Sequence, residues 1–110
     1  MSLVTGQCAA NAPALAQTDI DALLPEVPAW AVVDGKLARR FAFTDYYDTI
    51  AFVNALAWMT HQQDHHPELL VTYNSCDMRL NTHSAGGALS RNDFICAARA
   101  DALYAQRAAA

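Results

Sequence analysis

The sequence has few basic residues. It contains 7 Lys and Arg against 11 Asp and Glu, which gives a formal net charge of -4 with histidine neutral. The basic residues are scattered along the chain. Because binding to phosphate backbones requires a concentrated positive surface, this composition argues against a nucleic-acid partner.

Cysteine and long apolar runs are also scarce. Cys8, Cys76 and Cys96 are an odd number without paired or metal-type spacing, which favours free thiols in a reducing compartment. The first residues lack the basic and apolar regions of a secretory signal, and no apolar run approaches the roughly 18 residues of a membrane span. We therefore expect a cytoplasmic protein that is neither secreted nor inserted in a membrane.

Several functional motifs are missing as well. The chain has no internal repeat, no glycine-rich phosphate loop and no nucleophile elbow. A length of 110 residues with 54% hydrophobic composition predicts one domain with one core. Residues 1–13 show no periodic apolar signal and predict a flexible leader without function, which leaves residues 14–110 as the single domain.

The first half of that domain predicts a short helix and a hairpin. Residues 18–21 have the form of a capping box led by Thr18, and Pro25 ends the helix soon afterwards. Residues 30–33 and 37–43 are strand-like, and Asp34-Gly35 between them is a strong hairpin signal.

The middle of the chain predicts a second helix. Thr44 can cap it, and Ile50, Val53 and Thr60 recur at helical spacing. It must end before Pro67, because the residue that precedes a proline is pushed out of the helical region.

Two further strands and a last helix complete the expected fold. The strands span residues 69–73 and 76–82, and residues 90–93 form a second capping box before a helix that reaches Tyr104 or Arg107. The order of these elements implies an α+β domain, with a four-stranded antiparallel sheet and three helices packed on one face.

All four histidines, His61, His65, His66 and His83, lie within one stretch of 23 residues. Histidine exchanges protons near neutral pH and also binds metals, so this clustering points to chemistry. Ordinary structural roles are also open: a favourable position at a helix C-terminus for His65 and His66, and simple solvent exposure for His61 and His83.

Metal binding is one alternative. His61 and His65 stand at i and i+4 on one helical face, and His83 could supply a third nitrogen, as in catalytic zinc sites. No acidic or thiol ligand stands at a compelling interval, so we assign no metal ligands.

The span 51–103 contains a polar residue, after three intervening residues a His-His-Pro run, then an aromatic, a further histidine and, after a glycine-rich loop, an acid: His61, His65, His66, Pro67, Tyr73, His83 and Asp93. With these residues the span resembles the pterin-4a-carbinolamine dehydratase family. Two features depart from the family. Many members carry Glu-Lys where this chain has His61-Gln62, and the loop before Asp93 is one residue longer than in animal members.

This resemblance implies dehydration of 4a-hydroxytetrahydropterin to quinonoid dihydropterin and water. That substrate is what remains after an aromatic amino acid hydroxylase has used its pterin cofactor, so the reaction belongs to tetrahydrobiopterin recycling. His65 and His83 are implied to transfer protons at the 4a-hydroxyl, and His66 to contact the pterin ring, although these roles could be exchanged. The pterin is the substrate, and no cofactor is expected.

The remaining motif residues are implied to support the site. Asp93 could orient an imidazole, cap the last helix, or do both. Asp64 and His61 are expected at the rim, with Pro67 in the motif beside them. Three aromatic side chains are typical of core or sheet packing, although one near the pocket could stack on the pterin: Trp30, Phe43 and Tyr73.

Self-association is also expected. Animal members of the family serve as a dimerisation cofactor of a homeodomain transcription factor, so a non-catalytic interaction module of the same fold is a further alternative. An exposed edge strand needs cover, which predicts a homodimer or homotetramer.

Overall fold

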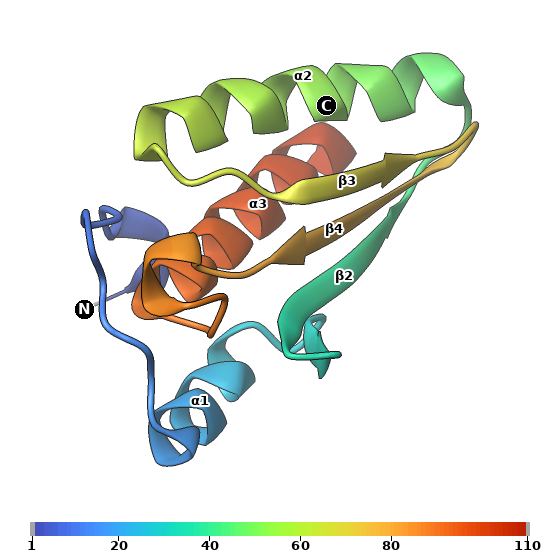
Figure 1. Cartoon of the computed structure of the whole chain (residues 1–110). Helices are drawn as coiled ribbons and strands as arrows, with labels where there is room; N and C mark the ends of the chain where they lie inside the picture. The colour runs from blue at the N-terminus through green and yellow to red at the C-terminus, as the bar shows by residue number, and fades with distance from the viewer. Residues whose placement is uncertain (1, 110) are drawn as a thin grey trace.

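The computed structural model describes residues 2–109 and has the predicted architecture. The four strands form one antiparallel sheet in the order β1-β2-β4-β3. Their bounds are Ala31–Val33 for β1, Lys36–Ala42 for β2, Glu68–Val71 for β3 and Ser75–Leu80 for β4. The α-helices are α1 Gln17–Leu23, α2 Tyr46–Gln63 and α3 Arg91–Ala109, and the short 3-10 turns are η1 Leu3–Thr5, η2 Leu24–Glu26 and η3 His83–Ala85. Figure 1 shows α2 and α3 together over one face of the sheet, with α1 apart from them, near the residues where β2 begins.

Strand alternation places the core between the sheet and the helices. In the register of β2 with β4, Phe41 pairs with Cys76 and Leu37 with Leu80, and all four are fully buried. The pair next to Phe41 and Cys76, Arg40 and Asp77, points to the opposite face. Phe41 is in contact with other aromatic rings at centroid distances of 4.7 to 5.9 Å, namely those of Trp30, Phe52 and Tyr104. This packing fixes the sheet against the two long helices.

The first hairpin is confirmed. Asp34 and Gly35 both have positive φ, 51° and 76°, as a two-residue turn of the favoured hairpin type requires. Aspartate tolerates this left-handed conformation better than most residues, and glycine adopts it freely.

Two predicted helix caps are wrong. Helix α1 begins at Gln17, and neither Thr18 nor any other side chain caps it. In α2 the cap is Asp45, whose carboxylate accepts the Asp48 N–H at 2.9 Å, while Thr44 donates its hydroxyl to the Asp48 carboxylate. Adjacent Thr and Asp residues are both good caps, and here the backbone turns helical one residue later than predicted.

The strands after α2 are shorter than predicted. β3 ends at Val71 and β4 at Leu80, so Tyr73 lies in the turn between them with 64% of its surface exposed. The core or sheet-packing role predicted for Tyr73 is therefore wrong, whereas Trp30 and Phe43 are buried as expected.

The cap of α3 is confirmed. The Ser90 hydroxyl accepts the Asn92 N–H at 3.2 Å, and the Asp93 carboxylate accepts the Ser90 N–H at 2.9 Å. Leu89 and Phe94, which flank this capping box, are both buried. Within residues 2–109, none of the helices combines the length and apolar character that crossing a membrane requires.

The leader follows a defined path beside α3 over residues 2–13. Leu3 is buried, and the Gly6 carbonyl accepts two hydrogen bonds from Arg99 at 2.5 and 3.1 Å. The Cys8 N–H donates to the Gln63 side chain at 2.8 Å. The leader predicted to be loose is thus packed on the domain in this structure, held by polar side chains that are distant in sequence.

Candidate active site

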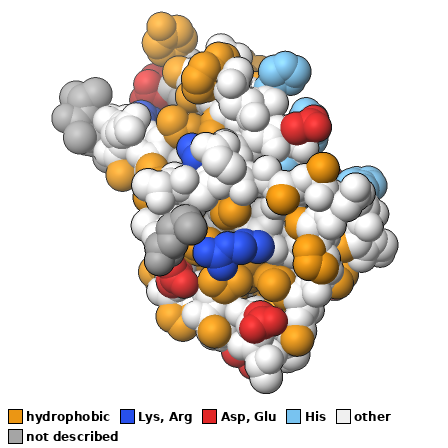
Figure 2. Space-filling view, turned by 90° about the vertical axis from the view of Figure 1, so that its left-hand side faces the viewer, with side chains coloured by type: hydrophobic (Ala, Val, Ile, Leu, Met, Phe, Trp, Pro, Cys, Tyr) orange, Lys and Arg blue, Asp and Glu red, His pale blue; other side chains and the backbone are white. Residues whose placement is uncertain are grey.

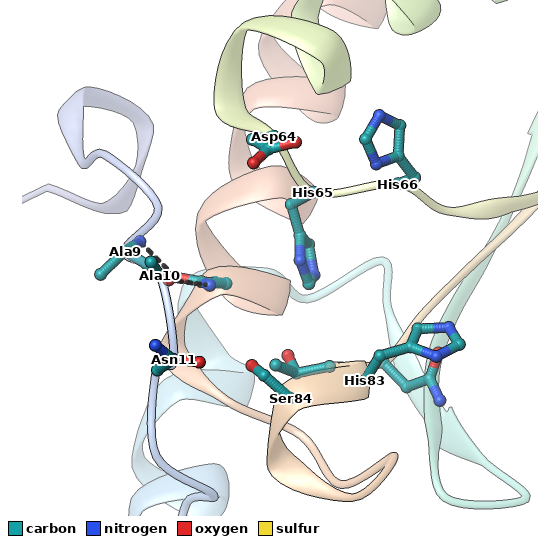
Figure 3. Close-up of a pocket in the computed structure, with 11 residues that line it drawn as sticks. Ala9, Ala10, Asn11, Asp64, His65, His66, His83 and Ser84 are labelled. Atoms are coloured by element: carbon teal, nitrogen blue, oxygen red, sulfur yellow. Dashed lines mark hydrogen bonds between the residues drawn. The ribbon is translucent and has the colours of Figure 1, made fainter.

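A pocket of about 400 Å³ lies where the leader, the connection after α2 and the connection after β4 meet. This volume falls within the range of about 300 to 1,000 Å³ that is usual for small-molecule sites. Figure 3 shows the residues around it, and Figure 2 shows histidine side chains along one side of the molecule. The lining residues are Ala9, Ala10, Asn11, Asp64, His65, His66, Asn81, Thr82, His83, Ser84 and Asn92.

The end of α2 aims His65 into the domain. Asp64 adopts the left-handed conformation that ends the helix, and its N–H bonds back to the Thr60 and His61 carbonyls. The His65 N–H then bonds to the Thr60 carbonyl at 3.1 Å. The resulting turn leaves the His65 ring only about one-tenth exposed, with Nε2 2.6 Å from Asp93 Oδ1. Nδ1 is therefore the ring nitrogen left for a ligand.

Asp93 sits behind His65 and accepts hydrogen bonds on both carboxylate oxygens. Oδ2 accepts the Ser90 N–H at 2.9 Å and the Thr82 hydroxyl at 2.8 Å, while Oδ1 faces His65. The side chain is fully buried. A buried carboxylate with this many donors has a fixed orientation, so Asp93 both caps α3 and holds the imidazole.

The environment of His65 favours its protonated form. The hydrogen bond to Asp93 raises the pKa of His65 above its ordinary value of 6.5, against the opposing effect of burial. The negative charges of Asp93, Cys8 and Asp64 act in the same direction as the hydrogen bond. The folded state therefore binds this proton more tightly than the unfolded chain does.

A pH dependence of stability follows for the pair of His65 and Asp93. Because the pKa of His65 is raised in the folded state, the pair contributes its full stabilising free energy at pH values below the unfolded-state pKa of about 6.5. This stabilisation is lost as the pH rises through the folded-state pKa. We expect urea unfolding to show that the stability difference between wild type and His65→Gln shrinks as the pH rises from about 6 to 8. A difference that is constant over this range would contradict the assignment.

The other two motif histidines line the same pocket from different elements. His66 lies in the connection between α2 and β3, and His83 begins η3 after β4. Both are exposed, and Figure 3 shows them on the side of His65 that faces away from the leader, with the His66 ring turned away from that of His65. Residues from a helix end and from a distant strand end thus share one small cavity.

The remaining predicted site residues divide into two groups. Asp64 lines the pocket, as expected for a rim residue. His61, Pro67 and Tyr73 do not line it, although the His61 ring centroid lies 6.5 Å from that of His66. The structure therefore places His61 next to the site, and the exposed Tyr73 ring in the turn after β3.

The metal alternative finds no support in the ligand geometry. Within the described part of the chain, no three His, Cys, Asp or Glu side chains are placed to hold a metal ion together.

Comparison with known proteins identifies the family. The sequence profile described as Pterin 4 alpha carbinolamine dehydratase matches residues 13–103. The chain belongs to this family. A relative from Nitrosomonas eutropha is 46% identical over 97 residues, covering 87% of this chain and 85% of its own length. One from Stenotrophomonas maltophilia is 51% identical over 94 residues, covering 84% and 80%. Both carry the provisional name pterin-4-alpha-carbinolamine dehydratase.

Two solved structures share the fold. A protein of Brucella melitensis, described as a transcriptional coactivator/pterin dehydratase, aligns with a TM-score of 0.76 at 29% identity, covering 82% of this chain and 97% of its own. A pterin dehydratase-like protein, described as a RuBisCO assembly factor in the alpha-carboxysome, aligns with a TM-score of 0.57 at 28% identity, covering 68% and 86%.

Part of the pocket lies outside the region that matches the dehydratase family. Ala9, Ala10 and Asn11 precede the matched residues 13–103 but line the cavity. Asn92 holds them there, because its side chain accepts the Ala9 N–H and donates to the Ala9 carbonyl, each at 2.9 Å. The sequence does not predict this wall, since the leader has no periodic pattern and Asn92 stands within a capping box.

Proposed function

We propose that this protein is a dehydratase that converts 4a-hydroxytetrahydropterin to quinonoid dihydropterin and water by histidine acid and base catalysis. The observation that carries the proposal is the shared pocket of His65, His66 and His83, with Asp93 bound to the first of them. Membership of the dehydratase family agrees with this chemistry.

The reaction requires proton transfer at two places. Hydroxide is a poor leaving group, so an acid must protonate the 4a-hydroxyl while a base removes the proton from N5 of the pterin. Each positioned acid or base typically contributes about 10² to 10⁴-fold, or roughly 3 to 5 kcal/mol. Imidazoles are suited to both tasks, because near neutral pH they occur in both protonation states.

The geometry suggests how the tasks divide. The raised pKa of His65 increases the fraction of its imidazolium form near neutral pH, so His65 suits the role of the acid that protonates the departing hydroxyl. Asp93 keeps the ring oriented and stabilises its charge. His83 acts with His65 at the 4a-hydroxyl, and the exposed His66 contacts the pterin ring and takes the N5 proton.

The direct test follows freshly generated 4a-hydroxytetrahydropterin by absorbance. The wild-type protein should accelerate its decay in proportion to protein concentration and yield quinonoid dihydropterin. Decay at the spontaneous rate would refute the proposal. Coupling to an aromatic amino acid hydroxylase, the expected source of the substrate, would place the reaction in tetrahydrobiopterin recycling.

Treatment with a chelator distinguishes the proposed histidine acid and base mechanism from the metal alternative. No cofactor is proposed, so dialysis against a strong chelator should leave the dehydration rate unchanged. Stoichiometric zinc in the purified protein, together with activity lost on chelation, would favour a metal site.

A protein-interaction role of the same fold is the second candidate. It is favoured by the descriptions of the two solved structures, one as a coactivator and one as an assembly factor. The open face of the sheet offers a surface, with a second hollow of about 400 Å³ lined in part by Lys36, Glu68 and Leu70. A folded protein that leaves the pterin untouched would support this role over catalysis.

The edge strands predict self-association. β1 and β3 form the two edges of the sheet, and β1 carries the exposed residues Val32 and Val33. Unpaired edges with apolar side chains favour association with another copy. Light scattering should therefore give the mass of a dimer or tetramer. A monomer mass that does not change with concentration would contradict this prediction.

A further inference from the structure

Two thiols from opposite ends of the chain meet beside the pocket. Cys8 Sγ lies 3.7 Å from Cys96 Sγ, although the residues are 88 positions apart in sequence. Cys8 Sγ also lies 3.6 Å from the Asn92 carbonyl oxygen. Cys8 is half-buried in the leader, and Cys96 is fully buried on α3. The contact therefore lies where the leader crosses the first turns of α3.

We propose that Cys8 and Cys96 are a redox-sensitive pair that forms a reversible disulfide with a peroxide as oxidant and so locks the leader wall of the pocket onto α3. The pairing of the two thiols does not rest on the proposed dehydration. Disulfides in reducing compartments are mostly transient and redox-sensing, which fits a pair that is reduced in the resting protein.

The local structure permits the bond. A disulfide requires the sulfur atoms to approach to about 2.05 Å, so the two thiols must close a gap of less than about 2 Å. Cys96 sits among the buried residues Ile95 and Ala97 on a long helix and is fixed. Cys8 lies in a non-helical segment after η1, where small backbone and side-chain rotations can bring its sulfur closer.

The surroundings make Cys8 the reactive partner. Its pKa is lowered chiefly by the hydrogen bond with Cys96, with the positive charges of His65 and Arg99 acting in the same direction, against the effects of burial and of the Asp93 charge. The same hydrogen bond and burial raise the pKa of Cys96. Burial, with the negative charge of Asp77 acting in the same direction, raises the pKa of Cys76 to about 11, and that thiol lies elsewhere, on β4. The thiolate is the nucleophile in such oxidations, so Cys8 reacts first.

The chemistry proceeds in two balanced steps. The Cys8 thiolate attacks one peroxide oxygen, the O–O bond breaks, and Cys8 becomes a sulfenic acid while hydroxide leaves and takes a proton from solvent. The Cys96 thiol then attacks the Cys8 sulfur, the S–O bond breaks, and the hydroxyl departs with the Cys96 proton as water. Two thiols are oxidised by two electrons in total, and the peroxide is reduced to two waters. A dithiol reductant reverses the bond by exchange.

The bond would act on the pocket through the next residue. Ala9 follows Cys8 directly and is already held to Asn92 by two hydrogen bonds. A covalent link at Cys8 therefore fixes the path of Ala9, Ala10 and Asn11, which form one wall of the cavity. When the disulfide is reduced, only the hydrogen bonds hold this wall in place.

Mass spectrometry of the peroxide-treated wild-type protein tests the pair. The intact chain should lose the mass of two hydrogens, and proteolysis without reduction should yield a peptide that joins Cys8 to Cys96. Dithiothreitol should restore both masses. Cys8→Ser should form no bridge, whereas the control variant Cys76→Ala should form it as wild type does.

Other oxidation products would overturn the proposal. These are a Cys8 that stops at sulfinic acid, a bridge between two chains, or two thiols that both stay reduced while free thiols in solution are consumed. Amide hydrogen exchange tests the effect on the wall: in the bridged protein, residues 9–11 should exchange more slowly than in reduced wild type. Unchanged exchange in a bridged protein would refute the locking of the leader.

Discussion

Replacing His65 by glutamine should lower kcat/KM for pterin dehydration by about 10² to 10⁴-fold, the contribution of one general acid or base. Glutamine can still donate a hydrogen bond to Asp93, so the packing around the buried carboxylate is kept. It cannot carry a proton to the substrate. The loss should therefore fall on catalysis, with unfolding by urea little changed at pH 8, where the imidazolium contributes less.

The same substitution at His61 provides the comparison. His61 is exposed on α2 and does not line the pocket, so His61→Gln should lose far less activity than His65→Gln. Equal losses in the two variants would show that the position of His65 against Asp93 has no special importance for catalysis.

Asp93→Asn should show the second large effect, on both catalysis and stability. In this variant, the side-chain carbonyl oxygen at position 93 can accept the hydrogen bonds from Ser90 and Thr82 only if the NH₂ group faces His65. His65 Nε2 must then accept a hydrogen bond from that NH₂ group. That arrangement moves the imidazole proton to Nδ1 and removes the negative charge that favours the imidazolium. We expect kcat/KM to fall by about 10²-fold or more and the free energy of unfolding to drop by about 1 to 3 kcal/mol.

Asp34→Asn is the matched control for this change. It makes the same chemical replacement in the exposed hairpin turn, where φ is 51° and asparagine is well tolerated. Activity and stability should both stay near wild type. If Asp93→Asn behaved like this control, the carboxylate would not be acting on His65.

The double variant His65→Gln/Asp93→Asn tests whether the two residues act as one unit. Because Asp93 is proposed to act through the imidazole, its loss should cost little once His65 is gone, and the two effects on kcat/KM should not add. Additive losses, measured in the same assay, would mean that Asp93 contributes by a separate route.

The architecture could be predicted from local patterns. Alternating side chains around Asp34-Gly35 specify the first hairpin, and the Ser90 to Asp93 box with its apolar flanks specifies the start of α3. The caps of the first two helices could not be predicted as well, since Thr44 and Asp45 are adjacent and both competent. Asp45 is the cap because the backbone becomes helical at the next residue, Tyr46.

Only part of the candidate active site could be predicted from the sequence. The resemblance to the dehydratase family implied one site for His65, His66 and His83, and all three line the same pocket. The leader wall gave no local signal, because its position depends on hydrogen bonds with Gln63, Asn92 and Arg99, which are distant from it in sequence by half the chain or more. Long-range hydrogen bonds of this kind follow from the folded arrangement and leave no periodicity in the segment that they hold.

The central claim is that three imidazoles around one cavity transfer the protons of a pterin dehydration. The most direct measurement follows the decay of freshly generated 4a-hydroxytetrahydropterin with wild type, His65→Ala, His66→Ala and His83→Ala, each shown by circular dichroism to be folded. Wild type should accelerate the decay strongly, and each variant should be clearly slower. Four folded proteins that accelerate the decay equally would contradict the assignment of the histidines.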